Sequence, residues 1–118
     1  MDNERVKVVE KLLKEHNDLI DKAEIEEFLN GKTQKLKEMD SIINMVNNAL
    51  DFVMNDEYYE IIEYNFLQGK DYHYCMKKIG INNKNTYFLN RKRLIYKITN
   101  FIYNDEYIED IKKELITK

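Results

Sequence analysis

Residues Lys70–Tyr103 read KDYHYCMKKIGINNKNTYFLNRKRLIYKITNFIY, and this stretch predicts two helices joined by a tight turn. The first helix covers Tyr72–Ile79 and the second covers Lys84–Tyr103. Gly80 begins the turn, because glycine adopts backbone conformations that other residues avoid. A short supporting helix, a fixed turn and a longer second helix are the parts of a helix-turn-helix.

Side chains at the expected helix ends support these boundaries. Asp71 is placed to cap the first of the two helices, and Asn82 or Asn83 to cap the second, because short polar side chains accept hydrogen bonds from the free N–H groups of a first turn. The sequence leaves the choice between the two asparagines open.

The same stretch carries the positive charge of the chain. It holds eight Lys or Arg and one Asp, a net charge of +7, whereas residues 1–69 have a net charge of −8 and residues 104–118 a net charge of −2. The whole chain has a formal net charge of −3. Positive charge gathered on a helix-turn-helix in an otherwise acidic chain indicates a polyanionic partner, most simply DNA.

The composition limits the class of protein. A chain of 118 residues suits one domain of ordinary size. The sequence shows neither an apolar run long enough to span a membrane nor a secretory signal. Its single cysteine, Cys75, cannot form an internal disulfide. We therefore expect a cytoplasmic protein with no membrane segment.

An all-α fold is expected, since the chain has no proline and only three glycines. Two N-terminal segments place apolar or semi-apolar residues at steps of three and four, which puts each set on one helix face. Asn30-Gly31 separates them and predicts an antiparallel helical hairpin over residues 1–54. The two stripes are Val6, Val9, Leu13, His16, Ile20 and Ala23, then Leu36, Met39, Ile43, Val46, Leu50 and Val53.

Residues 55–118 then form the helix-turn-helix module, although one compact domain is an alternative. A third helix through Tyr58–Leu67 follows a cap at Asn55-Asp56. The module ends in an amphipathic segment that contains Tyr107, Ile108, Ile111 and Leu115. The hairpin stripes have two interpretations: they pack inside the domain, or one of them forms the interface of a homodimer.

The second helix of the motif supplies candidate DNA contacts. Asn side chains bind adenine edges, Arg and Lys bind guanine edges, and other basic residues bind phosphates. Positions early in a recognition helix face the bases. The predicted base-reading residues are Asn83, Lys84, Asn85, Phe88, Leu89 and Lys92. The predicted phosphate contacts are Lys70, Lys77, Lys78, Arg91, Arg93 and Lys97.

Several short motifs carry a family resemblance. They are Ile61-Ile62 with Tyr64 and Phe66 before Gly69-Lys70, then Cys75-Met76 with Ile79-Gly80-Ile81, then Thr86-Tyr87 and Arg91-Lys92-Arg93-Leu94-Ile95. Together they resemble region four of sigma factors, and more closely the ArpU/RinA-type phage transcriptional regulators. The resemblance covers residues 41–103 and implies a sigma-like helix-turn-helix, double-stranded DNA as partner, and RNA polymerase as a further candidate partner.

One departure from that pattern concerns packing. Met76 stands where such motifs commonly have alanine, and its larger side chain either changes the crossing of the two helices or fills a gap. The asparagine cap replaces the usual Ser or Thr with an equivalent group.

No residues suggest catalysis. Cys75 lies at an apolar position and is expected to be a buried thiol. His16 and His73 have no neighbouring ligands at zinc spacing, and no phosphate loop or catalytic triad is visible. We expect no enzyme activity, no cofactor and no metal.

Three functions fit these observations. The first is a sequence-specific DNA-binding transcriptional regulator of phage or prophage origin. The second is a phage small terminase subunit, which would also join a helix-turn-helix to an oligomerising helical part. The third is a helical adaptor whose basic face binds an acidic protein.

Overall fold

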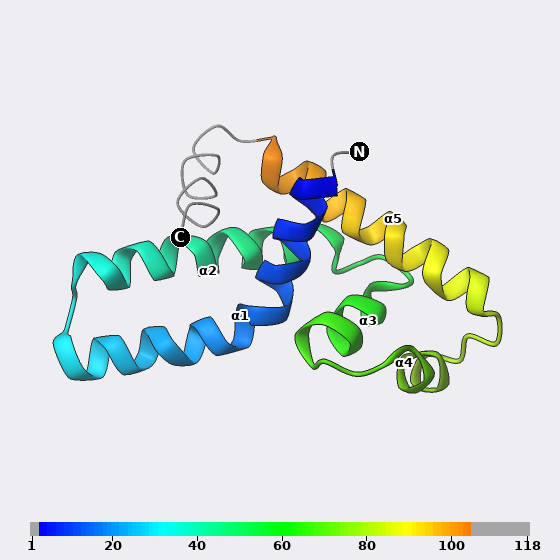
Figure 1. Ribbon diagram of the computed structural model, residues 1–118, viewed down its shortest axis with the longest axis horizontal. Helices are drawn as coiled ribbons and strands as arrows, with labels where there is room; N and C mark the ends of the chain where they lie inside the picture. Colours follow the sequence, from blue (N-terminus) through cyan, green and yellow to red (C-terminus); the bar gives the residue numbers. More distant parts are fainter. Residues whose placement is uncertain (1–2, 105–118) are drawn as a thin grey trace.

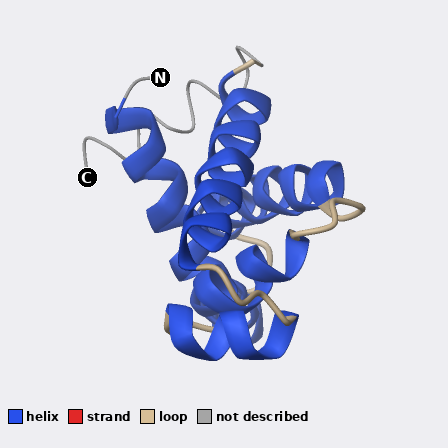
Figure 2. Ribbon diagram, turned by 90° about the vertical axis from the view of Figure 1, so that its right-hand side faces the viewer, coloured by secondary structure: helices blue, strands red, loops and turns tan. Residues whose placement is uncertain are grey.

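The computed structural model describes residues 3–104, and every regular element in that range is helical (Figure 1, Figure 2). The predicted all-α fold is confirmed. The predicted segment with Tyr107, Ile108, Ile111 and Leu115 lies outside the described residues. In chain order the elements are α1 (Asn3–Asn30), α2 (Gln34–Val53), α3 (Tyr59–Ile61), the π-helix η1 (Ile62–Leu67), α4 (Tyr72–Ile79) and α5 (Lys84–Tyr103).

The predicted antiparallel hairpin is formed by α1 and α2, and its far end extends away from the other helices (Figure 1). Gly31 ends α1 with a φ of 71°, in the left-handed region that favours glycine. Thr33 then caps α2: its Oγ1 accepts a hydrogen bond from the Leu36 N–H at 3.0 Å and donates to Glu26 Oε2 at 2.7 Å. The cap therefore ties the start of α2 to α1.

Most residues of the two predicted stripes are buried within the monomer, and Val6, Ile20, Met39 and Ile43 are partly buried. Eight of their residues belong to the core: Val9, Leu13, His16, Ala23, Leu36, Val46, Leu50 and Val53. Leu12, Met45 and Ala49 are buried as well, because α1 and α2 contact α5 in addition to each other. The main hydrophobic cluster joins α1, α2, η1 and α5, so both predicted segments, 1–54 and 55–118, contribute to one core.

His16 lies in the hairpin interface, as expected from its place in the α1 stripe. It is only 4% exposed, and its Nε2 lies 2.9 Å from Oδ1 of Asn47 on α2. The polar pair links the two helices at a defined register beside the apolar residues of the hairpin.

The third helix differs from the continuous α-helix expected over Tyr58–Leu67. One α-helical turn passes directly into η1, where the Gln68 N–H donates to the Glu63 carbonyl at 3.0 Å, an i→i−5 bond. Ile61 belongs to one hydrophobic cluster, and Ile62 and Phe66 belong to the other. Side-chain periodicity does not distinguish a short π-helix from an α-helix, so the π-helix could not be predicted from the sequence pattern.

A second, smaller cluster holds α4 against α5. Its buried members are Ile61, Cys75 and Tyr87. Met76 packs at its edge, so the larger side chain helps to fill the space between the helices. The Cys75 thiol is fully buried, as expected, and burial raises its pKa. This cluster fixes the position of α4 relative to the first turns of α5.

Candidate nucleic-acid interface

The turn between α4 and α5 has the geometry that the sequence predicts. Gly80 has a φ of 83°, and the N–H groups of Gly80 and Ile81 both donate to the Met76 carbonyl at 2.9 Å. A Cβ at Gly80 would meet no atom within 4 Å, so the requirement for glycine comes from the left-handed backbone and not from lack of space.

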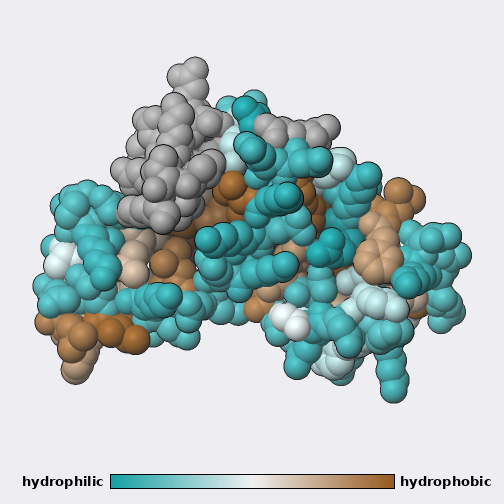
Figure 3. All heavy atoms as spheres, viewed as in Figure 1, coloured by the Kyte–Doolittle hydropathy of each residue, from teal (hydrophilic) through white to brown (hydrophobic). Residues whose placement is uncertain are grey.

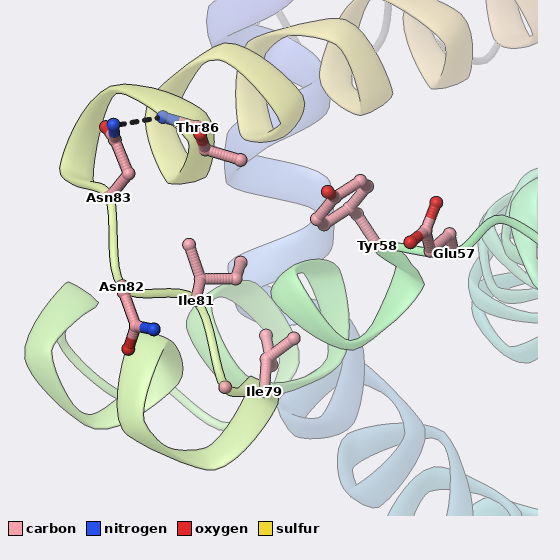
Figure 4. Close-up of a pocket in the computed structure, with 8 residues that line it drawn as sticks. Glu57, Tyr58, Ile79, Ile81, Asn82, Asn83 and Thr86 are labelled. Atoms are coloured by element: carbon pink, nitrogen blue, oxygen red, sulfur yellow. Dashed lines mark hydrogen bonds between the residues drawn. The ribbon is translucent and has the colours of Figure 1, made fainter.

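The start of α5 is capped by Asn83, which settles the choice between the two asparagines. Its Oδ1 accepts hydrogen bonds from the N–H groups of Asn85 at 2.8 Å and Thr86 at 3.3 Å, the second of which is drawn in Figure 4. Asn83 is a predicted base-reading residue, but the cap occupies its side-chain oxygen. Only its amide NH₂ group remains for a base.

A shallow hollow of about 380 Å³ lies behind this turn, between α5 and the residues that precede α3. Ile79 and Ile81 border it on one side and Tyr58 on the other (Figure 4). These three side chains also pack against the second cluster. The side chains that line the hollow therefore help to support the turn.

The first half of α5 presents an exposed stripe that we call the reading stripe: Lys84, Asn85, Phe88, Leu89 and Lys92. Their spacing of one, three and four residues puts them on one side of the helix, opposite the buried Tyr87 and Leu94. All five are exposed, and α5 contains no Asp or Glu. The helix N-terminus adds partial positive charge to this surface.

Aromatic side chains from α4 and α5 hold part of the stripe in place. The Phe88 ring lies 5.4 Å from the Tyr72 ring and 4.9 Å from the Tyr87 ring, centroid to centroid. Lys84 Nζ lies 4.8 Å from the Tyr72 centroid and 5.9 Å from that of Phe88, within the range of cation–π attraction. These contacts orient Phe88 and Lys84 before any ligand binds.

Arg91, a predicted phosphate contact, is engaged inside the fold. Its Nε donates to Asn65 Oδ1 at 2.8 Å, its guanidinium carbon lies 4.4 Å from the Phe66 ring centroid, and its Nη2 lies 3.5 Å from Glu10 Oε2. Arg91 thus links α5 to η1 and α1. A DNA phosphate would compete with these partners.

Arg93, also a predicted phosphate contact, forms a bidentate ion pair with Asp56. Its two terminal nitrogens donate to the two Asp56 carboxylate oxygens, each at 2.8 Å. Asp56 Oδ1 also accepts from the Tyr58 N–H at 2.9 Å. Hydrogen bonding to Arg93 is the main reason that the pKa of Asp56 falls from 3.8 to about 2. The pair fastens α5 to the turn before α3.

Replacing Asp56 with Asn should destabilise the protein by about 1–2 kcal/mol at neutral pH, a value reduced for solvent screening because the Arg93 side chain is 43% exposed. Asn retains an oxygen for the Tyr58 N–H, so the change removes mainly the charge. The pKa of Asp56 is lowered in the folded state. Its ionised carboxylate therefore stabilises the fold above about pH 4, and this stabilisation is lost as the pH falls toward 2.

Chemical denaturation of both proteins between pH 2 and pH 7 would measure this difference. The free energies of unfolding of wild type and Asp56→Asn should become nearly equal as the pH approaches 2. A difference in free energy of unfolding that stays constant over the whole range would show that the charge of Asp56 does not matter.

The remaining predicted phosphate contacts are exposed lysines. Lys77 and Lys78 lie in the last turn of α4, and Lys70 precedes α4 with its Nζ 5.2 Å from the Tyr74 ring centroid. Lys97 lies on another side of α5 from the reading stripe, with its Nζ 5.5 Å from the Phe52 ring centroid. Lys70, Lys77 and Lys78 are thus on or next to the same supporting helix.

Sequence reasoning did not assign the partners that hold the arginines. Asp56 and Asn65 lie 37 and 26 residues from Arg93 and Arg91, so no local spacing marks them. It also overlooked an exposed apolar group, Ile25, Phe28 and Leu29, which we call the tip patch. Their spacing of three and four residues marks one helix face, but it resembles the start of another buried stripe.

Between residues 3 and 104, no three His, Cys, Asp or Glu side chains are grouped to hold a metal ion. No helix in that range is long and apolar enough to cross a membrane. Comparison of this chain with protein-family models, with curated proteins and with solved structures finds no match.

Proposed function

We propose that this protein binds double-stranded DNA sequence-specifically and regulates transcription. The observation that carries the proposal is the reading stripe, which consists of five exposed side chains on the first half of α5. This helix is capped by Asn83, contains no acidic residue and packs against the supporting helix α4. This combination suits insertion of α5 into a major groove, with lysines of α4 near the backbone.

The sequence pattern supports a narrower assignment. The resemblance to ArpU/RinA-type regulators favours a phage or prophage origin, a cytoplasmic site of action and RNA polymerase as a second partner. Within the described residues, the acidic surface lies mainly outside α4 and α5, which would orient the encounter with a polyanion.

Binding of the full chain to random-sequence duplex DNA at low salt tests the proposal, followed by selection of bound sequences. We expect micromolar binding that weakens steeply with salt, and enrichment of a defined site. Absence of any binding at low salt would refute the proposal and favour the adaptor that binds an acidic protein. Binding without enrichment would refute sequence-specific recognition.

We further propose that two copies act together, since one helix-turn-helix of this size binds weakly and two half-sites supply affinity. Most residues of the two predicted hairpin stripes are buried within the monomer, which favours the interpretation that they pack inside the domain. The tip patch is an exposed apolar surface of the hairpin: Ile25, Phe28 and Leu29 are 57%, 89% and 67% exposed. Figure 3 shows apolar atoms at this end of the molecule.

Light scattering should therefore give twice the mass of the chain, and Phe28→Ser should give the mass of a monomer because it places a polar group in the tip patch. A ring of many subunits would instead favour the small terminase subunit. A wild-type protein that stays monomeric at high concentration would contradict the paired arrangement. Circular dichroism of Phe28→Ser would verify that the hairpin is still folded.

A further inference from the structure

Leu89 is the exposed aliphatic member of the reading stripe. It is 69% exposed, between the polar Asn85 one turn before it and Lys92 one turn after it. A single exposed leucine is common on protein surfaces. Here, however, the leucine lies in the middle of a stripe whose charge favours a polyanion, on the part of a recognition helix that lies closest to base edges.

The neighbouring Asn85 offers a matching polar contact. Its backbone N–H bonds to Asn83, but its side-chain amide makes no hydrogen bond to any described residue. That amide has one acceptor and one donor on the same edge, which fits the N6 and N7 groups of adenine. Because Asn85 and Leu89 are four residues apart, they lie one above the other on the helix, about 6 Å apart along its axis.

We propose that Leu89 contacts the C5-methyl group of a thymine and that Asn85 binds an adenine one or two base pairs away. The thymine methyl is the apolar group that base pairs present in the major groove, so it is the natural partner for an exposed leucine there. A separation of about 6 Å spans fewer than two base-pair steps of about 3.4 Å. The inference rests on the proposed function and narrows it to operators with closely spaced A·T pairs.

Lys84 and Lys92 bracket this pair of side chains and would limit how the helix can shift along the groove. Phe88 is the other apolar member of the stripe, but Tyr72 and Tyr87 already pack against its ring, and it is less exposed, at 40%. Leu89 therefore offers the more accessible apolar surface to a base.

The test replaces single thymines of the selected duplex with deoxyuridine, which removes only the C5-methyl group. Wild-type protein should bind about threefold to tenfold more weakly when the contacted thymine is replaced, as expected for one buried methyl group. Leu89→Ala should bind the thymine and deoxyuridine duplexes equally well at that position. Met54→Ala, which truncates an exposed apolar side chain (54%) at the end of α2, outside both the reading stripe and the tip patch, should retain the wild-type preference for thymine.

The outcomes separate this inference from the function on which it rests. Absence of duplex binding by the wild type would overturn both. Duplex binding that tolerates deoxyuridine at every position would overturn thymine reading alone, as would a Leu89→Ala variant that keeps the preference for thymine. Equal thermal unfolding midpoints of Leu89→Ala and wild type would show that the variant changes recognition and not folding.

Discussion

Replacing Phe66 with Ala should destabilise the protein by about 3–5 kcal/mol, a large part of the stability of a domain of this size. Phe66 is 1% exposed and belongs to the cluster that joins α1, α2, η1 and α5. Its ring also lies beneath the Arg91 guanidinium, at 4.4 Å. Truncation would leave a cavity where four helices meet and would remove the surface on which Arg91 rests.

Urea denaturation followed by circular dichroism measures this change. Phe28→Ala is a matched control, because the same atoms are removed from a side chain that is 89% exposed. It should change the free energy of unfolding by no more than about 0.5 kcal/mol when all proteins are measured at a concentration at which light scattering shows monomers. Similar losses for the two variants would mean that Phe66 does not anchor the core.

The second large effect concerns binding. Replacing both Lys84 and Lys92 with Ala should weaken binding to duplex DNA at low salt by about 10-fold to 100-fold, because each charge lost reduces counterion release. The slope of log affinity against log salt should become shallower by about one unit for each lysine. Fluorescence anisotropy over a series of salt concentrations measures both quantities.

A control with the same change in net charge is available at the other end of the molecule. Lys32 lies between α1 and α2, Lys37 lies in the first turn of α2, and both are exposed. Figure 1 shows that this end of the hairpin extends away from α4 and α5. Lys32→Ala with Lys37→Ala should leave the salt slope close to that of wild type. An unchanged slope in the Lys84 and Lys92 variant would argue against direct DNA contact by the reading stripe, whereas equal losses in both variants would indicate an effect of net charge alone.

Local signals predicted most of the secondary structure. The bounds of α4 and α5 were expected from Asp71, Gly80 and the asparagines before Lys84, since caps and left-handed turns depend on residues close in sequence. The hairpin followed from two apolar stripes and Asn30-Gly31. These features were readable because each depends on neighbours within a few residues.

The candidate site was predicted in part for the same reason. The helical repeat places Lys84, Asn85, Phe88, Leu89 and Lys92 on one side of α5, and the structure leaves all five exposed. The arginines were less predictable, because a basic residue on an amphipathic helix can serve either as a contact to a ligand or as part of an internal ion pair. Which role is available depends on residues from other helices.

The sequence by itself determined the helices, their caps, the glycine turn and the segregation of charge, because these arise from local backbone preferences and composition. Only the tertiary structure decided that Arg93 pairs with Asp56, that Arg91 rests on Phe66, and that the hairpin stripes serve the internal core. Those outcomes depend on how distant segments pack. Such contacts between residues far apart in the sequence cannot be predicted from local sequence patterns.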